Sequence, residues 1–238
     1  MTRKVGLLGA GYILDAHAKA LATLPAVRLS VVCDAARGRA ARAAARYGAP
    51  DVCTSIEELA RHDCEVVHVL LPPPLHIPAA QALIEAGKSV FLEKPMGLDG
   101  RACAALAQLA SDRGVALGIN HNFLFSRSYE ALRGAVHAGE LGRLDRIAVN
   151  WHFGLPLLQA GPFDAWPIAA PANLIFELGS HLLAFVIDLV GAPRVIHAEA
   201  SLPLTLPNGQ SIPRHWTALL RRESASVVLS LSVMAGHA

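Results

Sequence analysis

The sequence predicts an α/β protein in two parts, a doubly wound parallel sheet followed by an α+β domain. Over residues 4–119, short apolar runs alternate with longer helical patterns, which is typical of β-α-β units with helices on both faces of a parallel sheet. A glycine turn follows the first apolar run, where such folds pass from strand to helix. After residue 120 the alternation stops, and the tail alternates like an antiparallel sheet. We therefore expect one domain over residues 1–119 and another over residues 120–238.

The strands of the first domain are almost continuous in Val, Leu and Ile, as expected of strands that are covered on both faces. They are predicted over residues 4–8, 28–33, 65–71, 89–92 and 115–119, and helices over residues 13–23, 37–47, 77–86 and 100–113.

The second domain is expected to combine helices, an ordered loop rich in proline and glycine, and antiparallel strands. The helices are predicted over residues 128–138 and 173–190, the loop over 155–172, and the strands over 146–153, 195–203 and 215–233. A Pro207-Asn208-Gly209 turn in the tail fits an antiparallel sheet.

Composition limits the classes of partner. The chain has 238 residues, 53% of them hydrophobic, so it can bury a substantial core. Its formal net charge is +2 and the basic residues are scattered, so we expect no nucleic-acid partner. The four cysteines form no C-x-x-C pair, which argues against a disulfide framework or a metal site and indicates reduced thiols in the cytoplasm.

We expect neither a signal peptide nor a membrane span. The first apolar run is short and lacks the cleavage site of a signal peptide. The most apolar long segment, residues 174–191, contains Glu177, His181 and Asp188, which argues for a buried helix.

The first glycine turn is a candidate dinucleotide site. Gly9 and Gly11 suit a tight turn in which the backbone approaches a pyrophosphate, and the helix that begins near Tyr12 and Ile13 would direct its N–H groups at the phosphates. The third glycine of G-x-G-x-x-G is replaced by Leu14. An ordinary glycine turn is the alternative.

Asp34 ends the second strand, where a carboxylate can bind the adenosine ribose of a dinucleotide. A carboxylate there repels a 2′-phosphate and so favours NAD over NADP. Arg37, three residues on, could offset that repulsion. The alternative role for Asp34 is a helix cap, and the two roles are compatible.

The loop from Leu71 and Pro72 to His76 follows the strand at 65–71 and is expected beside the nicotinamide half of the crevice. We expect His76 to pack against the cofactor or support the loop rather than take part in the chemistry.

Glu93-Lys94-Pro95 forms a rigid turn after another buried strand. A lysine beside a positively charged nicotinamide ring loses its proton more readily, because like charge disfavours the ammonium form. Lys94 could then share a proton with a substrate hydroxyl or polarise a carbonyl. The alternative is a surface lysine paired with Glu93.

Glu177 and His181 are four residues apart in an apolar helix and are therefore expected on one face. A carboxylate one turn away can orient a histidine and raise its basicity, which makes His181 a general acid/base candidate. A satisfied core pair is equally compatible with the sequence.

Several segments together resemble the glucose–fructose oxidoreductase / inositol dehydrogenase / rhizopine catabolism (Gfo/Idh/MocA) family. They are residues 9–13 with His17, residues 72–76, residues 86–95, residues 139–142, and the helix that carries Glu177, Gly179 and His181. The resemblance covers nearly the whole chain, and residues 86–95 are its most specific part.

The resemblance implies a Rossmann domain, then a substrate domain with an open, mostly antiparallel sheet. It also implies NAD or NADP as cofactor, hydride transfer at a hydroxyl- or carbonyl-bearing carbon of a sugar, cyclitol or related polyol, and a homo-oligomer. The catalytic positions of the family correspond to Lys94, Glu177 and His181. Asn120, His121 and Asn122 correspond to its substrate pocket, and loop residues that cap the next helix are the alternative for these three.

The chain departs from the family in three respects. Glu177 stands where an aspartate is usual, and Ala184 where an aspartate is frequent. Relatives usually run longer, so the chain is expected to be C-terminally short, with an incomplete sheet and an open edge.

The main functional hypothesis is an NAD(P)-dependent dehydrogenase in which His181 moves the proton, Lys94 stabilises the oxyanion and Glu177 tunes His181. The alternative is a catalytically silent dinucleotide-binding sensor or assembly protein. A third hypothesis keeps the fold and uses NAD transiently in glycoside cleavage or epimerisation.

Overall fold

The structure, a computed structural model, describes residues 2–234. The chain divides into two compact units, Met1–Asn120 and His121–Ala238, each with its own hydrophobic core. Among the described residues, no helix is both long enough and apolar enough to cross a membrane.

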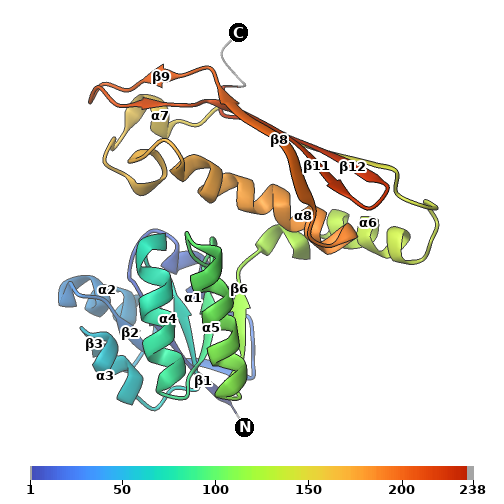
Figure 1. Cartoon of the computed structure of the whole chain (residues 1–238). Helices are drawn as coiled ribbons and strands as arrows, with labels where there is room; N and C mark the ends of the chain where they lie inside the picture. The colour runs from blue at the N-terminus through green and yellow to red at the C-terminus, as the bar shows by residue number, and fades with distance from the viewer. Residues whose placement is uncertain (1, 235–238) are drawn as a thin grey trace. The chain divides into compact units, whose positions relative to one another are not determined.

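The first unit is built on six parallel strands in the order β3-β2-β1-β4-β5-β6, coloured blue to green in Figure 1. Because β1 lies between β2 and β4, the winding of the chain reverses there, as in a doubly wound sheet. The predicted fold class is confirmed. The strands are β1 (Arg3–Leu8), β2 (Val27–Cys33), β3 (Asp51–Cys53), β4 (Val66–Val69), β5 (Ser89–Leu92) and β6 (Leu117–Ile119).

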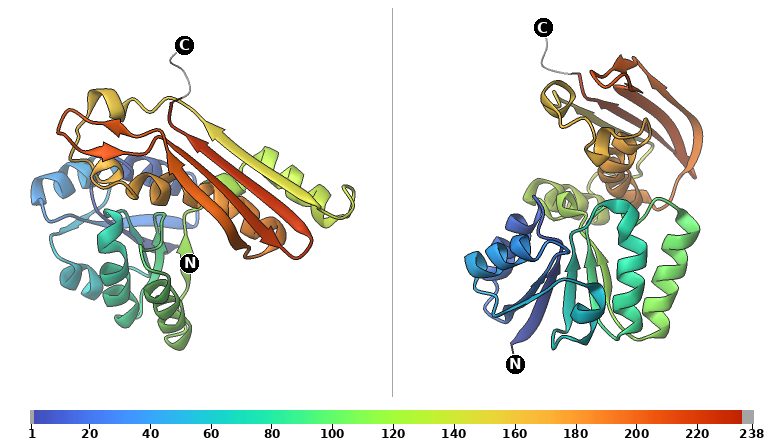
Figure 2. Two further views of the ribbon diagram at one scale, coloured as in Figure 1. Left: turned by 45° about the horizontal axis from the view of Figure 1, so that its top comes forward. Right: turned by 90° about the vertical axis from the view of Figure 1, so that its left-hand side faces the viewer.

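Helices cover both faces of this sheet. Helices α1 (Leu14–Ala22) and α2 (Arg37–Tyr47) share one core cluster with β1. The opposite face packs against three helices, two of which Figure 2 shows in its right-hand view as the teal and green helices beside the sheet. They are α3 (Ile56–Arg61), α4 (His76–Glu85) and α5 (Gly100–Asp112). Strand β3 and helix α3 were not expected from the sequence, because three and six residues are too few for a clear hydrophobic period.

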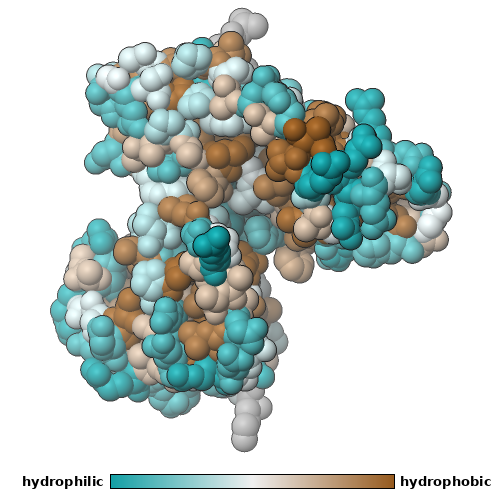
Figure 3. Space-filling view, in the orientation of Figure 1, coloured by the Kyte–Doolittle hydropathy of each residue, from teal (hydrophilic) through white to brown (hydrophobic). Residues whose placement is uncertain are grey.

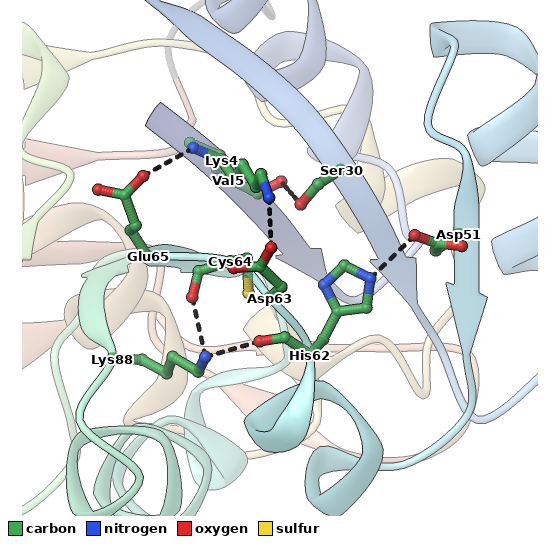
Figure 4. A network of polar contacts seen from close by, with 9 residues as sticks. All are labelled: Lys4, Val5, Ser30, Asp51, His62, Asp63, Cys64, Glu65 and Lys88. Carbon is green, nitrogen blue, oxygen red and sulfur yellow. Dashed lines mark hydrogen bonds and ion pairs between the residues drawn. The ribbon is translucent and has the colours of Figure 1, made fainter. Parts of the chain in front are cut away.

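Polar contacts join the amino ends of the strands (Figure 4). Lys4 at the start of β1 pairs with Asp63, and its backbone N–H donates to Glu65 Oε1 at 3.2 Å. Just before β5, Lys88 Nζ donates to the carbonyl oxygens of His62 at 2.7 Å and Cys64 at 2.9 Å. These bonds give a charged donor to two carbonyls in the segment that follows α3, beyond its last helical residue.

The second unit contains a four-stranded sheet in the order β7-β12-β11-β8. Two neighbouring pairs are antiparallel and the β12–β7 pair is parallel, so the expected mostly antiparallel sheet is confirmed. Strand β8 forms an edge, and nearly all of its residues are exposed. The strands are β7 (Arg146–His152), β8 (Arg194–Ser201), β11 (His215–Arg222) and β12 (Ala225–Ser232); a small hairpin adds β9 (Leu204–Thr205) and β10 (Ser211–Ile212).

Helix α8 (Ser180–Val190) packs its apolar side on this sheet, where Leu182 and Val186 meet Trp216 in one core cluster. An uninterrupted α-helix over 173–190 was expected, and this is wrong, because Ile175–Gly179 forms a π-helical turn, η4. A π turn has the apolar composition of the α-helix around it, so the sequence carries no separate signal for it. The remaining helices are η1 (Pro73–Leu75), η2 (Asn122–Phe125), α6 (Arg127–His137), α7 (Leu157–Ala160) and η3 (Trp166–Ile168), the last two inside the expected loop.

Candidate active site

Gly9 occupies a position that only glycine can fill. Its φ is +103°, and a Cβ there would lie 2.8 Å from the carbonyl oxygen of Leu70. The Gly9 N–H donates to the Cys33 carbonyl at 2.8 Å, which ties the turn to the end of β2. The turn therefore lies at the carboxyl ends of three neighbouring strands, where doubly wound sheets bind their ligands.

Gly11 leaves space beside the turn. A Cβ built on it meets no atom within 4 Å, and the following Tyr12 side chain is 98% exposed. Ile13, the N-cap of α1, makes no side-chain hydrogen bond to the helix. An open glycine before a helix without a side-chain cap fits the approach of a pyrophosphate to the backbone.

Asp34 lies against this turn with only 8% of its surface exposed. Its Oδ2 accepts a hydrogen bond from the Ala10 N–H at 2.8 Å, and its Oδ1 accepts one from the Ala36 N–H at 2.8 Å. Burial alone would raise the pKa of Asp34, but the hydrogen bonds from Ala10, Arg39 and Ala36 outweigh it and lower the pKa. The carboxylate therefore joins the glycine turn to the start of α2 and stays ionised.

The arginine that contacts Asp34 is Arg39, whereas the sequence directed attention to Arg37. Arg39 donates to Asp34 Oδ1 from Nε at 3.1 Å and from Nη2 at 2.9 Å. It lies three positions after the Ala36 N-cap of α2. A helix that begins at Arg37 directs its third residue back toward the N-cap, so the spacing from a helix start could have indicated Arg39.

His76 fastens the loop after β4 to the Glu-Lys-Pro turn. The side chain is fully buried, with Nδ1 2.7 Å from the Pro95 carbonyl oxygen and Nε2 2.7 Å from the Leu71 carbonyl oxygen. The prolines of η1, which follows Pro72, keep this loop short and stiff. His76 therefore fixes the distance between Leu71 and the turn that carries Lys94.

Glu93 is held by partners from two other elements. Its Oε1 is 2.8 Å from His17 Nε2 of α1 and accepts a hydrogen bond from Asn120 Nδ2, after β6, at 2.6 Å. The Lys94 N–H donates to Glu93 Oε2 at 3.3 Å, and the Lys94–Pro95 peptide bond is cis. Asn120, expected in the substrate pocket, uses its side chain here to hold Glu93.

A second histidine extends this cluster. His17 Nδ1 is 2.9 Å from Nδ1 of His68, which points from β4. Burial, and then the neighbouring His17, lower the pKa of His68 to about 4. Burial would raise the pKa of Glu93, but hydrogen bonds from His17 and Asn120 lower it. His68 is not among the predicted site residues, although a histidine between valines in a buried strand needs a partner.

In the second unit, His181 lies near the start of α8 in an aromatic setting. Its ring centroid is 4.6 Å from that of Phe123 and 5.8 Å from that of Trp151, both with an edge toward a face. These ring contacts restrict the orientation of the imidazole.

Glu177 lies in the π turn just before α8, so its separation from His181 is not that of an ordinary α-helical turn. Inserted π turns occur frequently at functional sites. Of the remaining predicted pocket residues, Asn122 begins the exposed η2 and His121 is its half-buried N-cap.

The second unit also contains an apolar cavity of about 540 Å³ between η4, α8 and the sheet. Ile175, Leu182 and Leu183 line it from the helical side, and Ala198 and Trp216 from the sheet. Figure 3 shows brown side chains gathered where α8 and β8 come together. Neither Glu177 nor His181 is among the described residues that line this cavity, although Gly179, between them in the sequence, is.

These features can be compared with known proteins. The profile of the GFO_IDH_MocA family, whose description is "Oxidoreductase family, NAD-binding Rossmann fold", matches residues 3–121. The chain belongs to this family. The predicted resemblance is therefore confirmed. The matched segment of this chain contains the glycine turn, Asp34 and Lys94.

Similar proteins include inositol 2-dehydrogenase of Rhizobium meliloti (strain 1021), 33% identical over 63% of this chain and 45% of that protein. The trans-1,2-dihydrobenzene-1,2-diol dehydrogenase of Mus musculus is 32% identical over 82% of this chain and 58% of that protein. This family member thus spans about half the length of the curated relatives it matches.

Solved structures agree in fold. A putative myo-inositol dehydrogenase from Sinorhizobium meliloti 1021 has a TM-score of 0.85 at 26% identity, covering 97% of this chain and 69% of that one. The scyllo-inositol dehydrogenase of Lactobacillus casei with bound NAD(H) and scyllo-inositol has a TM-score of 0.85 at 20% identity, covering 98% and 70%. At that identity the second likeness shows the fold alone.

Proposed function

We propose that this protein is an NAD(P)-dependent dehydrogenase acting on a CH–OH carbon of a polyol, sugar or cyclitol. The observation that carries the proposal is the buried Asp34 carboxylate, bound to the Ala10 N–H of a turn whose Gly9 cannot accept a side chain. That arrangement suits a dinucleotide whose ribose binds near Asp34 and whose pyrophosphate lies over Gly11. Several relatives are named as dehydrogenases of inositols and of a dihydrodiol.

The chain's own residues would hold the cofactor as follows. Gly9, Gly11, Tyr12 and Ile13 form the turn and helix start that face the phosphates. The loop that His76 clamps at Leu71 would border the nicotinamide. When bound, a nicotinamide dinucleotide supplies the site that accepts or donates hydride.

For the chemistry we assign three roles. His181 takes or returns the proton of the substrate oxygen, and its aromatic neighbours keep the imidazole in one orientation. The Lys94 ammonium stabilises negative charge that develops on the substrate, and Glu177 adjusts the basicity of His181. Asn122 and His121 are proposed to contact the substrate.

We propose NAD rather than NADP as the preferred cofactor, because the Asp34 carboxylate repels a 2′-phosphate. Arg39 moderates that preference, since its guanidinium already binds Asp34 and is more than half exposed. Calorimetry should show that Arg39→Ala weakens NADP binding several-fold more than NAD binding. Arg37→Ala, on the same helix, is the matched control and should leave the ratio of the two affinities unchanged.

The function is tested by titrating NAD and NADP and then following nicotinamide absorbance with a panel of polyols, cyclitols and sugars. We expect oxidation of at least one polyol, and a loss of about a hundredfold or more in kcat for His181→Ala with NAD affinity retained. Dinucleotide binding without turnover on any substrate would instead identify a silent sensor or assembly protein. Product formation without net NADH would point to transient use of NAD.

The proposal places the protein in the reducing cytoplasm, because all four cysteines are free thiols. Its partner there is a small molecule.

A further inference from the structure

Four polar side chains from four different elements meet beneath the Glu-Lys-Pro turn. His17 comes from α1, His68 from β4, Glu93 from the end of β5 and Asn120 from the end of β6. Phe91 covers the two imidazoles, with ring centroids 6.1 Å from His17 and 5.0 Å from His68. None of the roles assigned above explains why two histidines lie in this apolar setting, where each needs a partner.

The hydrogen-bond donors and acceptors of this cluster determine which nitrogens carry a proton. The Glu93 carboxylate can only accept, so His17 Nε2, 2.8 Å from it, carries a proton. His17 Nδ1 and His68 Nδ1 lie 2.9 Å apart, so one donates and the other accepts. His17 therefore has a defined partner on each side, and its ring cannot rotate without losing both hydrogen bonds.

Glu93 adjoins the residue assigned to the chemistry. Its Oε1 is bound by His17 and Asn120, while its Oε2 accepts a long bond from the Lys94 backbone N–H, at 3.3 Å. Burial raises the pKa of Glu93, but the hydrogen bonds from His17 and Asn120, and then the charges of His17 and Lys94, lower it. The strength with which Glu93 attracts the Lys94 ammonium thus depends on how fully other donors satisfy the carboxylate.

We propose that His17 is the positioning residue for Lys94. By donating to Glu93 it limits the attraction between that carboxylate and the neighbouring ammonium, and His68 holds its ring in the donating orientation. The catalytic consequence rests on the proposed function, but the effect on Lys94 itself does not. Of the described residues, the titratable groups that contact His17 are His68 and Glu93, and Lys94 follows Glu93. Asp15, on the same helix, pairs with Arg46.

The test measures acetylation of lysines by an amine-reactive ester, in the full chain without substrate, by peptide mass spectrometry. In His17→Leu the buried carboxylate loses a donor and attracts the nearest cation more strongly, so Lys94 should react about threefold or more slowly. His17→Gln places an amide N–H near the former Nε2 and should restore the rate. Exposed Lys19, on α1, is the internal reference and should react equally in every variant.

Two further variants separate positioning from damage to the fold. Asn120→Ala removes the other donor to Glu93 and should also slow acetylation of Lys94, with Lys19 unaffected. His62→Gln, which changes a histidine bound to Asp51 at the amino ends of the strands, should leave both rates unchanged. An unchanged Lys94 rate in folded His17→Leu and Asn120→Ala, or no recovery in His17→Gln, would overturn the proposal.

Turnover provides the second readout. We expect His17→Leu to lower kcat about tenfold, with the affinity for dinucleotide within about twofold, and His17→Gln to recover most of the loss. If the wild-type chain turns over no substrate, the proposed function fails, while the acetylation rates still decide the role of His17. If turnover is present and neither Lys94 reactivity nor kcat responds to His17, only the positioning role fails.

Discussion

Gly9 and Gly11 illustrate how one turn imposes two different requirements on neighbouring glycines. A Cβ on Gly9 would collide with the Leu70 carbonyl, and its φ of +103° disfavours any side chain, whereas Gly11 faces open space. We expect Gly9→Ala to lower the free energy of unfolding by about 1–3 kcal/mol. Gly11→Ala should change stability by less than about 0.5 kcal/mol but weaken NAD binding about tenfold. Urea denaturation and calorimetry check the pair; equal stability losses would contradict it.

His68 should make stability depend on pH. Its pKa falls from 6.5 to about 4 on folding, so below pH 6.5 the unfolded chain binds a proton that the folded chain does not. The stabilisation is therefore complete above pH 6.5 and is lost as the pH falls toward 4. Between pH 6.5 and 4.5 the wild type should lose about 2–3 kcal/mol more unfolding free energy than His68→Asn, which keeps a donor near the former Nδ1 and does not titrate. Parallel losses in the two proteins would show that another group is responsible.

At the level of secondary structure, the amino ends of the strands have defined polar contacts, as the carboxyl ends do. Lys88 binds two backbone carbonyls near the end of α3, at 2.7 and 2.9 Å. We expect Lys88→Met to lower the free energy of unfolding by about 1.5–3 kcal/mol, because those carbonyls lose a charged donor. Since Lys88 lies at the opposite end of the strands from Gly9 and Asp34, NAD affinity should not change. Lys19→Met, on the exposed side of α1, is the control and should be nearly neutral in both measurements.

Elements with enough residues to show a period could be predicted. Helix α2 and strand β5 have the expected bounds, and the turn holding Gly9 follows β1 as expected. The hydrophobic pattern does not predict the short β3 and α3, and it predicts α-helix where the π turn precedes α8. In each case the hydrophobic pattern is too short or too similar to an α-helix to decide between backbone geometries.

Contacts between elements were harder to foresee. Asp34 was identified by its position after a strand, but its partner Arg39 depends on where α2 begins. Glu93 was noted for its motif, yet its bonds to His17 and Asn120 join segments 76 and 27 residues away. Spacing within a segment cannot reveal such pairs, since they follow from the strand order of the folded sheet.

At the level of the whole chain, one of the two compact units contains the residues proposed to bind the dinucleotide. The glycine turn, Asp34 and the Glu93 cluster all lie in Met1–Asn120, which has its own core. We expect a chain of residues 1–120 to fold and to bind NAD within about tenfold of the affinity of residues 1–238. Circular dichroism and calorimetry check this expectation. A folded fragment without NAD affinity would show that the second unit contributes essential contacts to the dinucleotide.

Among the described residues, β8 is an edge strand of its sheet, and we expect this edge to limit the concentration at which the purified protein stays in solution. On the side away from β11, no other described strand pairs with it, and its Val195 and Ile196 are 63% and 43% exposed. Exposed edge strands of different molecules can pair with one another. Loss of protein to aggregation during storage or refolding should therefore rise steeply with protein concentration. Arg194, His197 and Glu199 interrupt this edge with polar side chains, and replacing them with threonine should hasten precipitation.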